Sequence, residues 1–204
     1  MTIFQFYQLS QLCRRRLIWL MVVSWLAFVG VTNAQPQPVS FVSGTVRYTA
    51  SDANATWQGD APIASLDWDI NLDHLPAVML EVRSNPADFN SGNLIRDTNA
   101  RRSVFNVRRH PEIIFVGERF VATSTRLQDG NTLTGNVSGP LTMHGIRCEV
   151  NLPVTLTRNG TELEVGSEFS VLLTDYEMTR PSFLGVTVDD EVQLTVTMVG
   201  VLEP

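Results

Sequence analysis

Strict alternation of apolar and polar side chains runs through most of the chain and is the feature that most limits its fold. In residues 65–73 every second side chain is apolar, and the same period returns in residues 133–143 and 146–156. Successive side chains of a β-strand point to opposite faces, so this period predicts strands with one buried face. The sequence therefore predicts an antiparallel all-β fold whose sheet is covered on one side.

The alternating stretches predict about eight or nine strands, and Asp129-Gly130 and Asn159-Gly160 supply hairpin signals between them. Residues 87–102 break the alternation and predict one short helix between strands. Long strands with one helical insertion favour a closed barrel over a seven-stranded sandwich. A barrel of this size either fills with side chains or holds one apolar ligand. We expect the strands at residues 41–50, 53–58, 63–73, 78–84, 112–122, 131–143, 146–157, 161–174 and 191–201.

Two glycines on the apolar face of residues 131–143 have two interpretations. Gly135 and Gly139 add no side chain to that face, so they could leave room inside the barrel. A glycine inside a strand also commonly marks a bulge or a barrel corner. The sequence does not choose between these interpretations.

The first 34 of the 204 residues have the pattern of a secretory signal. Three arginines, Arg14 to Arg16, precede an apolar run at residues 17–31, and small residues lead to a cleavage site after Ala34. The run spans about 22 Å as a helix, too short for the roughly 30 Å hydrocarbon core. We therefore expect cleavage, a mature domain at residues 35–204, no membrane span in it, and a periplasmic or secreted protein. Its net charge would be 12 − 21 = −9, and Cys148 would be its single thiol.

Motifs for chemistry are scarce. The acidic pI of about 5.0 argues against a nucleic-acid partner. The sequence has no G-x-S-x-G, G-x-G-x-x-G, P-loop or H-E-x-x-H pattern. His74, His110 and His144 stand far apart, and Cys148 shares an apolar face with its strand neighbours. We therefore expect no catalytic residues, no metal site, no cofactor and no enzymatic activity.

Basic residues concentrate in one part of an acidic chain. Residues 83–126 hold eight arginines and four acids, a local charge of 8 − 4 = +4, which leaves 4 − 17 = −13 for the rest of the mature chain. Arginine suits contacts with phosphate or carboxylate, so this band could hold an anionic group beside a barrel mouth. The same arginines could instead neutralise acidic side chains at the surface, which is the interpretation we favour at this point.

Several motifs together resemble those of the YceI-like family. Residues 91–97, with Arg101 and Phe105, are similar to its segment G-N-x-x-R-D-x-H-x-R-S-x-x-F. Residues 110–115 follow its Y/H-P-x-I-x-F pattern, and residues 135–145 are similar to its G-x-L-T-L-H-G strand.

The resemblance covers about residues 41–202 and carries its own expectations. It implies a lipocalin-like antiparallel β-barrel in the bacterial periplasm or outside the cell. The apolar interior of that barrel would hold the isoprenoid tail of a polyprenyl or quinone-type lipid, and members of the family are often dimeric. The chain departs from the pattern at Asn99, where His is usual, and at Arg102, where Ser is common. The first strand, residues 46–50, also lacks a His that many members carry.

We expect the barrel interior to bind the lipid and its mouth to lie near the helical insertion. The mouth residues would be Arg96, Arg101, Tyr176 and Phe183, although Arg96 could equally form a structural ion pair with Asp97. For the large lining residues, ordinary core packing explains the pattern equally well. The expected lining residues are Trp68, Ile70, Leu80, Phe115, Val137, Leu141, Val171 and Leu194.

Two other functions stay open. A packed β-barrel that acts only through its surface, as an interaction or stress-response module, would have an interior filled with side chains. An enzyme would need one of the three histidines to meet an acid or Cys148 in one cleft.

Overall fold

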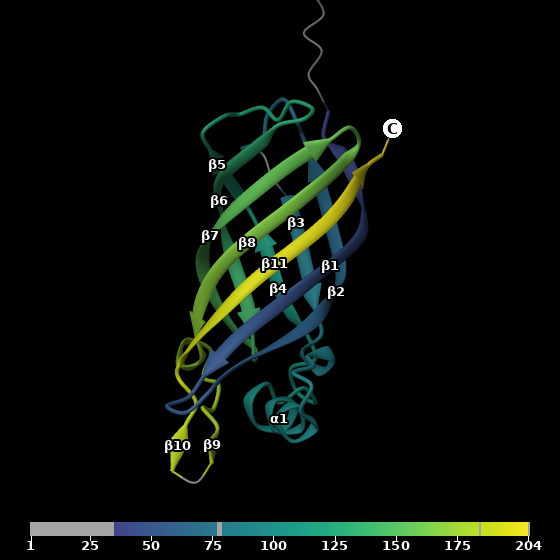
Figure 1. The fold of residues 1–204 in the computed structure, drawn as a ribbon. Coiled ribbons are helices and arrows are strands. Elements are labelled where there is room, and N and C mark those ends of the chain that lie inside the picture. Colours follow the sequence, from purple (N-terminus) through teal and green to yellow (C-terminus); the bar gives the residue numbers. More distant parts are fainter. Residues whose placement is uncertain (1–34, 77–78, 184, 204) are drawn as a thin grey trace, which may run out of the picture. The chain divides into compact units, whose positions relative to one another are not determined.

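Within the residues that the structure describes, nine strands form one antiparallel sheet that closes on itself (Figure 1). The structure is a computed structural model and describes residues 35–76, 79–183 and 185–203, the side chain of Phe183 excepted. The expected signal at residues 1–34, with its cleavage site, lies outside them. The elements are β1 (Gln37–Ser51), β2 (Thr56–Ile70), β3 (Met79–Ser84), η1 (Pro86–Asp88), α1 (Leu94–Asn99), η2 (Ala100–Val104), β4 (Ile113–Gly117), β5 (Arg119–Ala122), β6 (Thr132–Met143), β7 (Ile146–Asn159), β8 (Glu162–Leu172), η3 (Leu173–Tyr176), β9 (Ser182–Phe183), β10 (Val186–Thr187) and β11 (Glu191–Leu202).

The sheet closes because β4 and β5 both pair with β6. The strand order is β4-β3-β2-β1-β11-β8-β7-β6-β5, and the extra pairing of β4 with β6 joins its two edges. Only Glu118 separates β4 from β5, so together they occupy the place of one broken strand. The result is a closed eight-stranded antiparallel barrel with one short helix, which confirms the predicted fold class.

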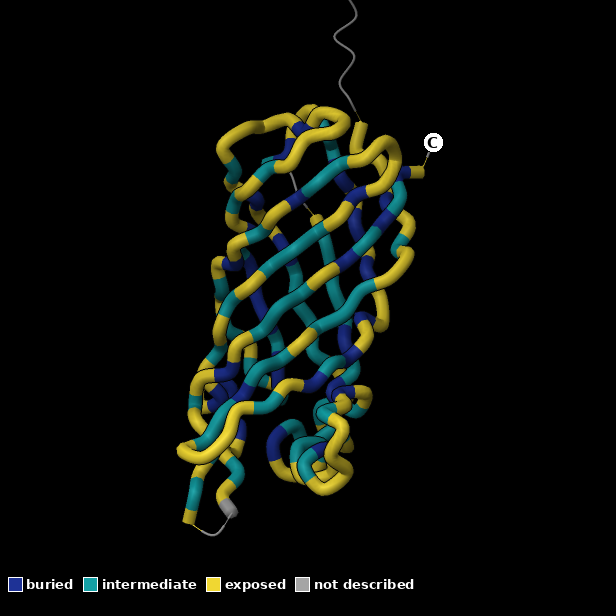
Figure 2. Tube along the Cα trace, viewed as in Figure 1, coloured by how far each residue is buried: buried dark blue, intermediate teal, exposed yellow. Residues whose placement is uncertain are grey.

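The alternating pattern of the sequence becomes the inside and outside of the barrel. Along β11 the side chains of Val192 and Met198 are buried, whereas those of Gln193 and Thr197 are exposed. Figure 2 shows the same alternation of buried or intermediate with exposed residues along the other strands. Burial of one face of every strand in a common interior explains why the period of two is so regular.

Three local features differ from the expectation. Residues 53–58 and 63–73, expected as two strands, belong largely to the single strand β2, and a register shift between Ile63 and Ser65 marks an irregularity in its pairing with β3. The expected helix is shorter than predicted: α1 has six residues, begins at an Asn93 cap and continues into the π-helical turn η2. The short turn η3 and the β9–β10 hairpin were not predicted.

The two glycines of β6 serve close contact between strands. A Cβ atom at Gly139 would collide with the carbonyl oxygen of Val116, and one at Gly135 would lie 2.5 Å from the carbonyl oxygen of Val121. Both positions therefore let β6 approach the broken strand formed by β4 and β5, as expected of a barrel corner. The alternative, room for a ligand, does not explain them.

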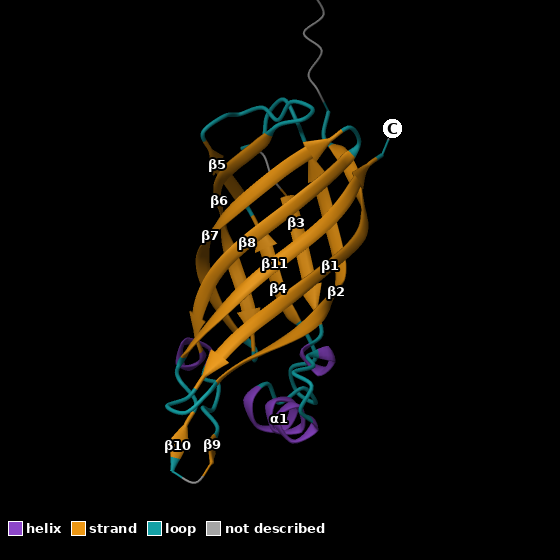
Figure 3. Cartoon of the chain, viewed as in Figure 1, coloured by secondary structure: helices purple, strands orange, loops and turns teal. Residues whose placement is uncertain are grey.

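The two ends of the barrel are built differently. At one end, here called the closed end, Leu75 and Leu127 are 1% and 2% exposed. Their loops are joined by hydrogen bonds from Leu75 N to Thr125 O and from Leu127 N to Leu72 O, both 2.9 Å. At the other end, here called the helical end, lie α1 and the short helical turns (Figure 3). Access to the barrel interior is therefore to be sought at the helical end.

Candidate functional site

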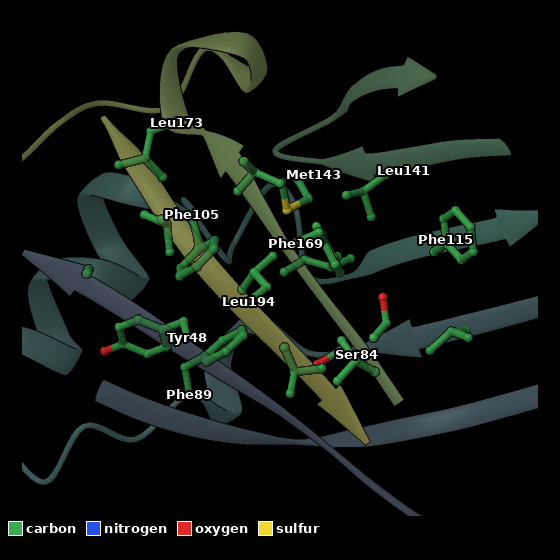
Figure 4. Close-up of a pocket in the computed structure, with 18 of the residues that line it drawn as sticks. Tyr48, Ser84, Phe89, Phe105, Phe115, Leu141, Met143, Phe169, Leu173 and Leu194 are labelled. Atoms are coloured by element: carbon green, nitrogen blue, oxygen red, sulfur yellow. The ribbon is translucent and has the colours of Figure 1, made fainter. Parts of the chain in front are cut away.

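A cavity of about 610 Å³ occupies the barrel interior (Figure 4). It is lined mainly by apolar side chains, most of them from the strands. Polar and charged residues of α1 and η2 border it at the helical end. Its volume falls in the range of pockets that hold small molecules, roughly 300–1,000 Å³. The interior filled by side chains that a purely surface-acting module requires is therefore not found.

Most of the expected binding residues border this cavity. Ile70 does not, because its side chain is fully buried in the packed core beside the closed end. Tyr176, the last residue of η3, is buried but does not line the cavity, and the side chain of Phe183 is outside the described residues. The expected residues that line the cavity are Trp68, Leu80, Phe115, Val137, Leu141, Val171, Leu194, Arg96 and Arg101.

An aromatic cluster that was not predicted lines the cavity towards the helical end. Tyr48 and Phe89 meet edge to face and Phe89 and Phe105 stack, each pair with ring centroids 5.5 Å apart. Tyr48 pairs across the strands with Gly59, and a Cβ atom there would collide with its ring. Burial raises the pKa of the Tyr48 phenol above its usual value, although a hydrogen bond with Ser91 acts in the opposite direction. This cluster depends on the pairing of Tyr48 with Gly59 on the neighbouring strand, which the sequence pattern does not indicate.

Helix α1 is fixed to the barrel without the ion pair suggested for Arg96 and Asp97. The guanidinium of Arg96 lies over the ring of Trp57, 4.7 Å from its centroid. The carboxylate of Asp97, 5% exposed, accepts hydrogen bonds from the backbone N–H and the hydroxyl of Ser91 at 3.0 and 2.6 Å. Arg96 thus connects α1 to β2, whereas Asp97 fixes the turn that leads into α1.

Arg101 brings a charged group to the apolar cavity. Its Nη2 donates to the carbonyl oxygen of Phe89 at 3.2 Å, and its Nε is buried without a hydrogen-bond partner among the described residues. The buried Nε1 of Trp68, which also lines the cavity, has no partner there either. An unpaired buried donor costs about 1–3 kcal/mol, so a bound molecule with an oxygen acceptor would recover that energy.

The arginines of residues 83–126 are mostly unpaired, contrary to the interpretation favoured from the sequence. Of the eight, only Arg83 and Arg126 form ion pairs with carboxylates in the described part of the chain. The arginines of the insertion form no ion pair with a carboxylate of the described residues. The positive charge at the helical end is therefore available to other molecules.

Two of the three histidines come together, although not in the cavity. The rings of His110 and His144 lie with centroids 4.6 Å apart, and Nδ1 of His144 is 3.1 Å from the carbonyl oxygen of Tyr176. Neither ring lines the cavity, and His74 lies in a loop of the closed end. The described residues contain no group of three or more His, Cys, Asp or Glu side chains placed to hold a metal ion.

The chain is similar to known proteins in sequence and in structure. A family model described as a YceI-like domain matches residues 32–200. No curated protein matches the sequence.

Three solved structures share the barrel. BcnA of Burkholderia cenocepacia is 19% identical with a TM-score of 0.63, over 76% of this chain and 95% of that one. A polyisoprenoid-binding domain from Saccharophagus degradans, implicated in plant cell wall breakdown, is 11% identical with a TM-score of 0.63, over 83% and 99%. The YceI protein of Campylobacter jejuni is 16% identical with a TM-score of 0.53, over 70% and 83%. Identities this low establish the shared fold alone.

Proposed function

Because the chain belongs to the YceI-like family, we propose that it is a periplasmic or secreted binding protein that holds an isoprenoid-type lipid inside its barrel. The observation that carries the proposal is the apolar cavity of about 610 Å³. Apolar surface removed from water contributes about 25 cal/mol per Å², so a tail enclosed by these walls would supply most of the affinity. A polyprenyl or a quinone-type lipid has such a tail.

The two ends of the barrel set the direction of the bound lipid. The tail points to the closed end, where Leu75 and Leu127 plug the interior. The polar end stays at the helical end, where the unpartnered Nε of Arg101 can donate a hydrogen bond to an oxygen atom. This orientation places the charged side chains beside the polar group and mostly apolar walls around the tail.

The expected location rests on the sequence. Export would follow from the signal at residues 1–34, with cleavage after Ala34. None of the helices in the described residues is long and apolar enough to cross a bilayer. Mass spectrometry of the protein from its own host tests the proposal, because cleavage predicts a mature protein that begins at Gln35.

Native mass spectrometry of the same protein, followed by solvent extraction, tests the lipid. We expect an added mass that is lost on denaturation and is recovered as a polyprenyl or quinone lipid. A bare mass, with no uptake of either lipid when it is added, would contradict the proposal. Dimers are common in the family, and the same spectra report whether two copies associate.

A further inference from the structure

Two large apolar side chains stand exposed beside the cavity. Leu94 and Ile95, the first residues of α1, are 81% and 77% exposed. Ile95 also lines the cavity, so its side chain belongs both to the outer surface and to the entrance. Adjacent exposed apolar residues at the opening of an apolar cavity indicate a contact surface rather than chance exposure.

The same segment is strongly basic. Residues 94–109 contain five arginines and one acid, Asp97, a charge of 5 − 1 = +4. Asp97 is buried and bonded to Ser91, so its carboxylate is turned to the protein and not to the surface. The three exposed arginines of this segment form no ion pair with the described carboxylates: Arg102, Arg108 and Arg109.

From these observations we propose that the helical end docks on a bilayer that contains anionic phospholipid. The Leu94 and Ile95 side chains enter the headgroup region, and the exposed arginines contact lipid phosphates. The inference rests on the proposed function, because docking would let a lipid tail pass between bilayer and cavity. Exposing the CH₂ groups of the tail to water during transfer costs free energy, so direct contact between the helical end and the bilayer would avoid that cost.

Charge distinguishes a membrane from a second copy of the chain as the occupant of this surface. A twofold dimer through the helical end would bring two +4 segments face to face. Like charges held that close destabilise an interface, whereas an anionic bilayer neutralises them. The membrane is therefore the partner that fits both the apolar pair and the arginines.

Flotation with vesicles tests the docking. Wild-type protein should bind vesicles of phosphatidylcholine and phosphatidylglycerol in equal amounts, bind pure phosphatidylcholine much less, and lose affinity as salt rises. Each surface arginine contributes about a fivefold factor, so R108Q/R109Q should bind about thirtyfold more weakly. The double variant L94S/I95S should bind at least about tenfold more weakly.

Matched variants elsewhere on the barrel provide controls. Met79 is 76% exposed at the start of β3, at the closed end, so M79S removes an equally exposed apolar side chain. R119Q/R126Q removes the same charge as R108Q/R109Q from outside residues 94–109. Both controls should bind vesicles as the wild type does.

The outcomes separate this inference from the proposed function. Protein that carries lipid in native mass spectra but does not float with anionic vesicles would overturn the docking and leave lipid binding intact. Protein that floats with anionic vesicles but neither carries nor takes up lipid would refute the proposed function and still support docking of the helical end on the bilayer. A dimer in gel filtration that is lost in L94S/I95S would reassign this surface to a second copy of the chain.

Discussion

Replacing Leu194 by tryptophan tests directly whether the cavity is a binding site. Leu194 lies on β11 and lines the cavity among aromatic side chains (Figure 4). Tryptophan adds about six heavy atoms, which would displace about five carbons of a bound tail, one isoprene unit. At about 0.8 kcal/mol per buried CH₂ group this costs about 4 kcal/mol, or roughly a thousandfold in affinity. A tail one unit shorter should lose much less.

The same substitution should hardly change stability. In a close-packed core an added ring costs about 1–3 kcal/mol, but a cavity of about 610 Å³ has room for it. We therefore expect Leu194→Trp to change the free energy of unfolding in urea by less than about 1 kcal/mol. Gln193→Trp, which places the ring on the outer face of the same strand, is the matched control. Undiminished lipid binding together with a loss of 1–3 kcal/mol would show that the site is packed core.

Three further changes test other parts of the structure. Gly145→Ala should lower the free energy of unfolding by about 1–3 kcal/mol, because φ is +80° there and the new Cβ would lie 2.8 Å from the His110 ring. Asp97→Ala leaves two donors without their acceptor and should speed hydrogen exchange in the insertion, at a cost of about 1–3 kcal/mol. The hydrogen bond from Arg47 lowers the pKa of the Asp60 carboxyl below 3.8, so the pair stabilises the fold above that pH and the contribution is lost as the pH falls through the lowered value. Acid unfolding of Asp60→Asn should therefore depend less on pH in that window, and an unchanged profile would contradict the pairing.

The barrel was predictable because its signal is repeated along the whole chain. Each strand buries one face in the same interior, so residues such as Val192 and Met198 follow the period of two however the strands are ordered. The hairpin at Asn159-Gly160 is also local, since Gly160 takes φ +65° directly after β7. Alternation therefore predicts well which side chains face the barrel interior, because successive side chains of a strand point to opposite faces.

The parts that were missed depend on contacts between distant residues. Alternation alone does not tell an interior residue at the cavity from one in the packed core, which is why Ile70 was grouped with Trp68 although only Trp68 lines the cavity. The aromatic cluster needs Tyr48 to lie opposite Gly59, a register that no short stretch of sequence states. The sequence also cannot show that, among the described residues, only Arg83 and Arg126 of residues 83–126 pair with carboxylates, because those contacts depend on the fold.

The segments that resemble the family include positions that support the fold and positions that line the cavity. Asn93 caps α1 with its side chain, and Gly145 leaves space for the His110 ring, so both support the fold. Asn99, where the family usually has His, instead lines the cavity and is exposed. An amide keeps one charge state where an imidazole titrates near neutral pH, so this position can change which polar group is accepted. Asn99→His should therefore change the lipids that co-purify, while the unfolding free energy changes by less than about 0.5 kcal/mol. A destabilised variant with the same lipids would place the role of Asn99 in folding instead.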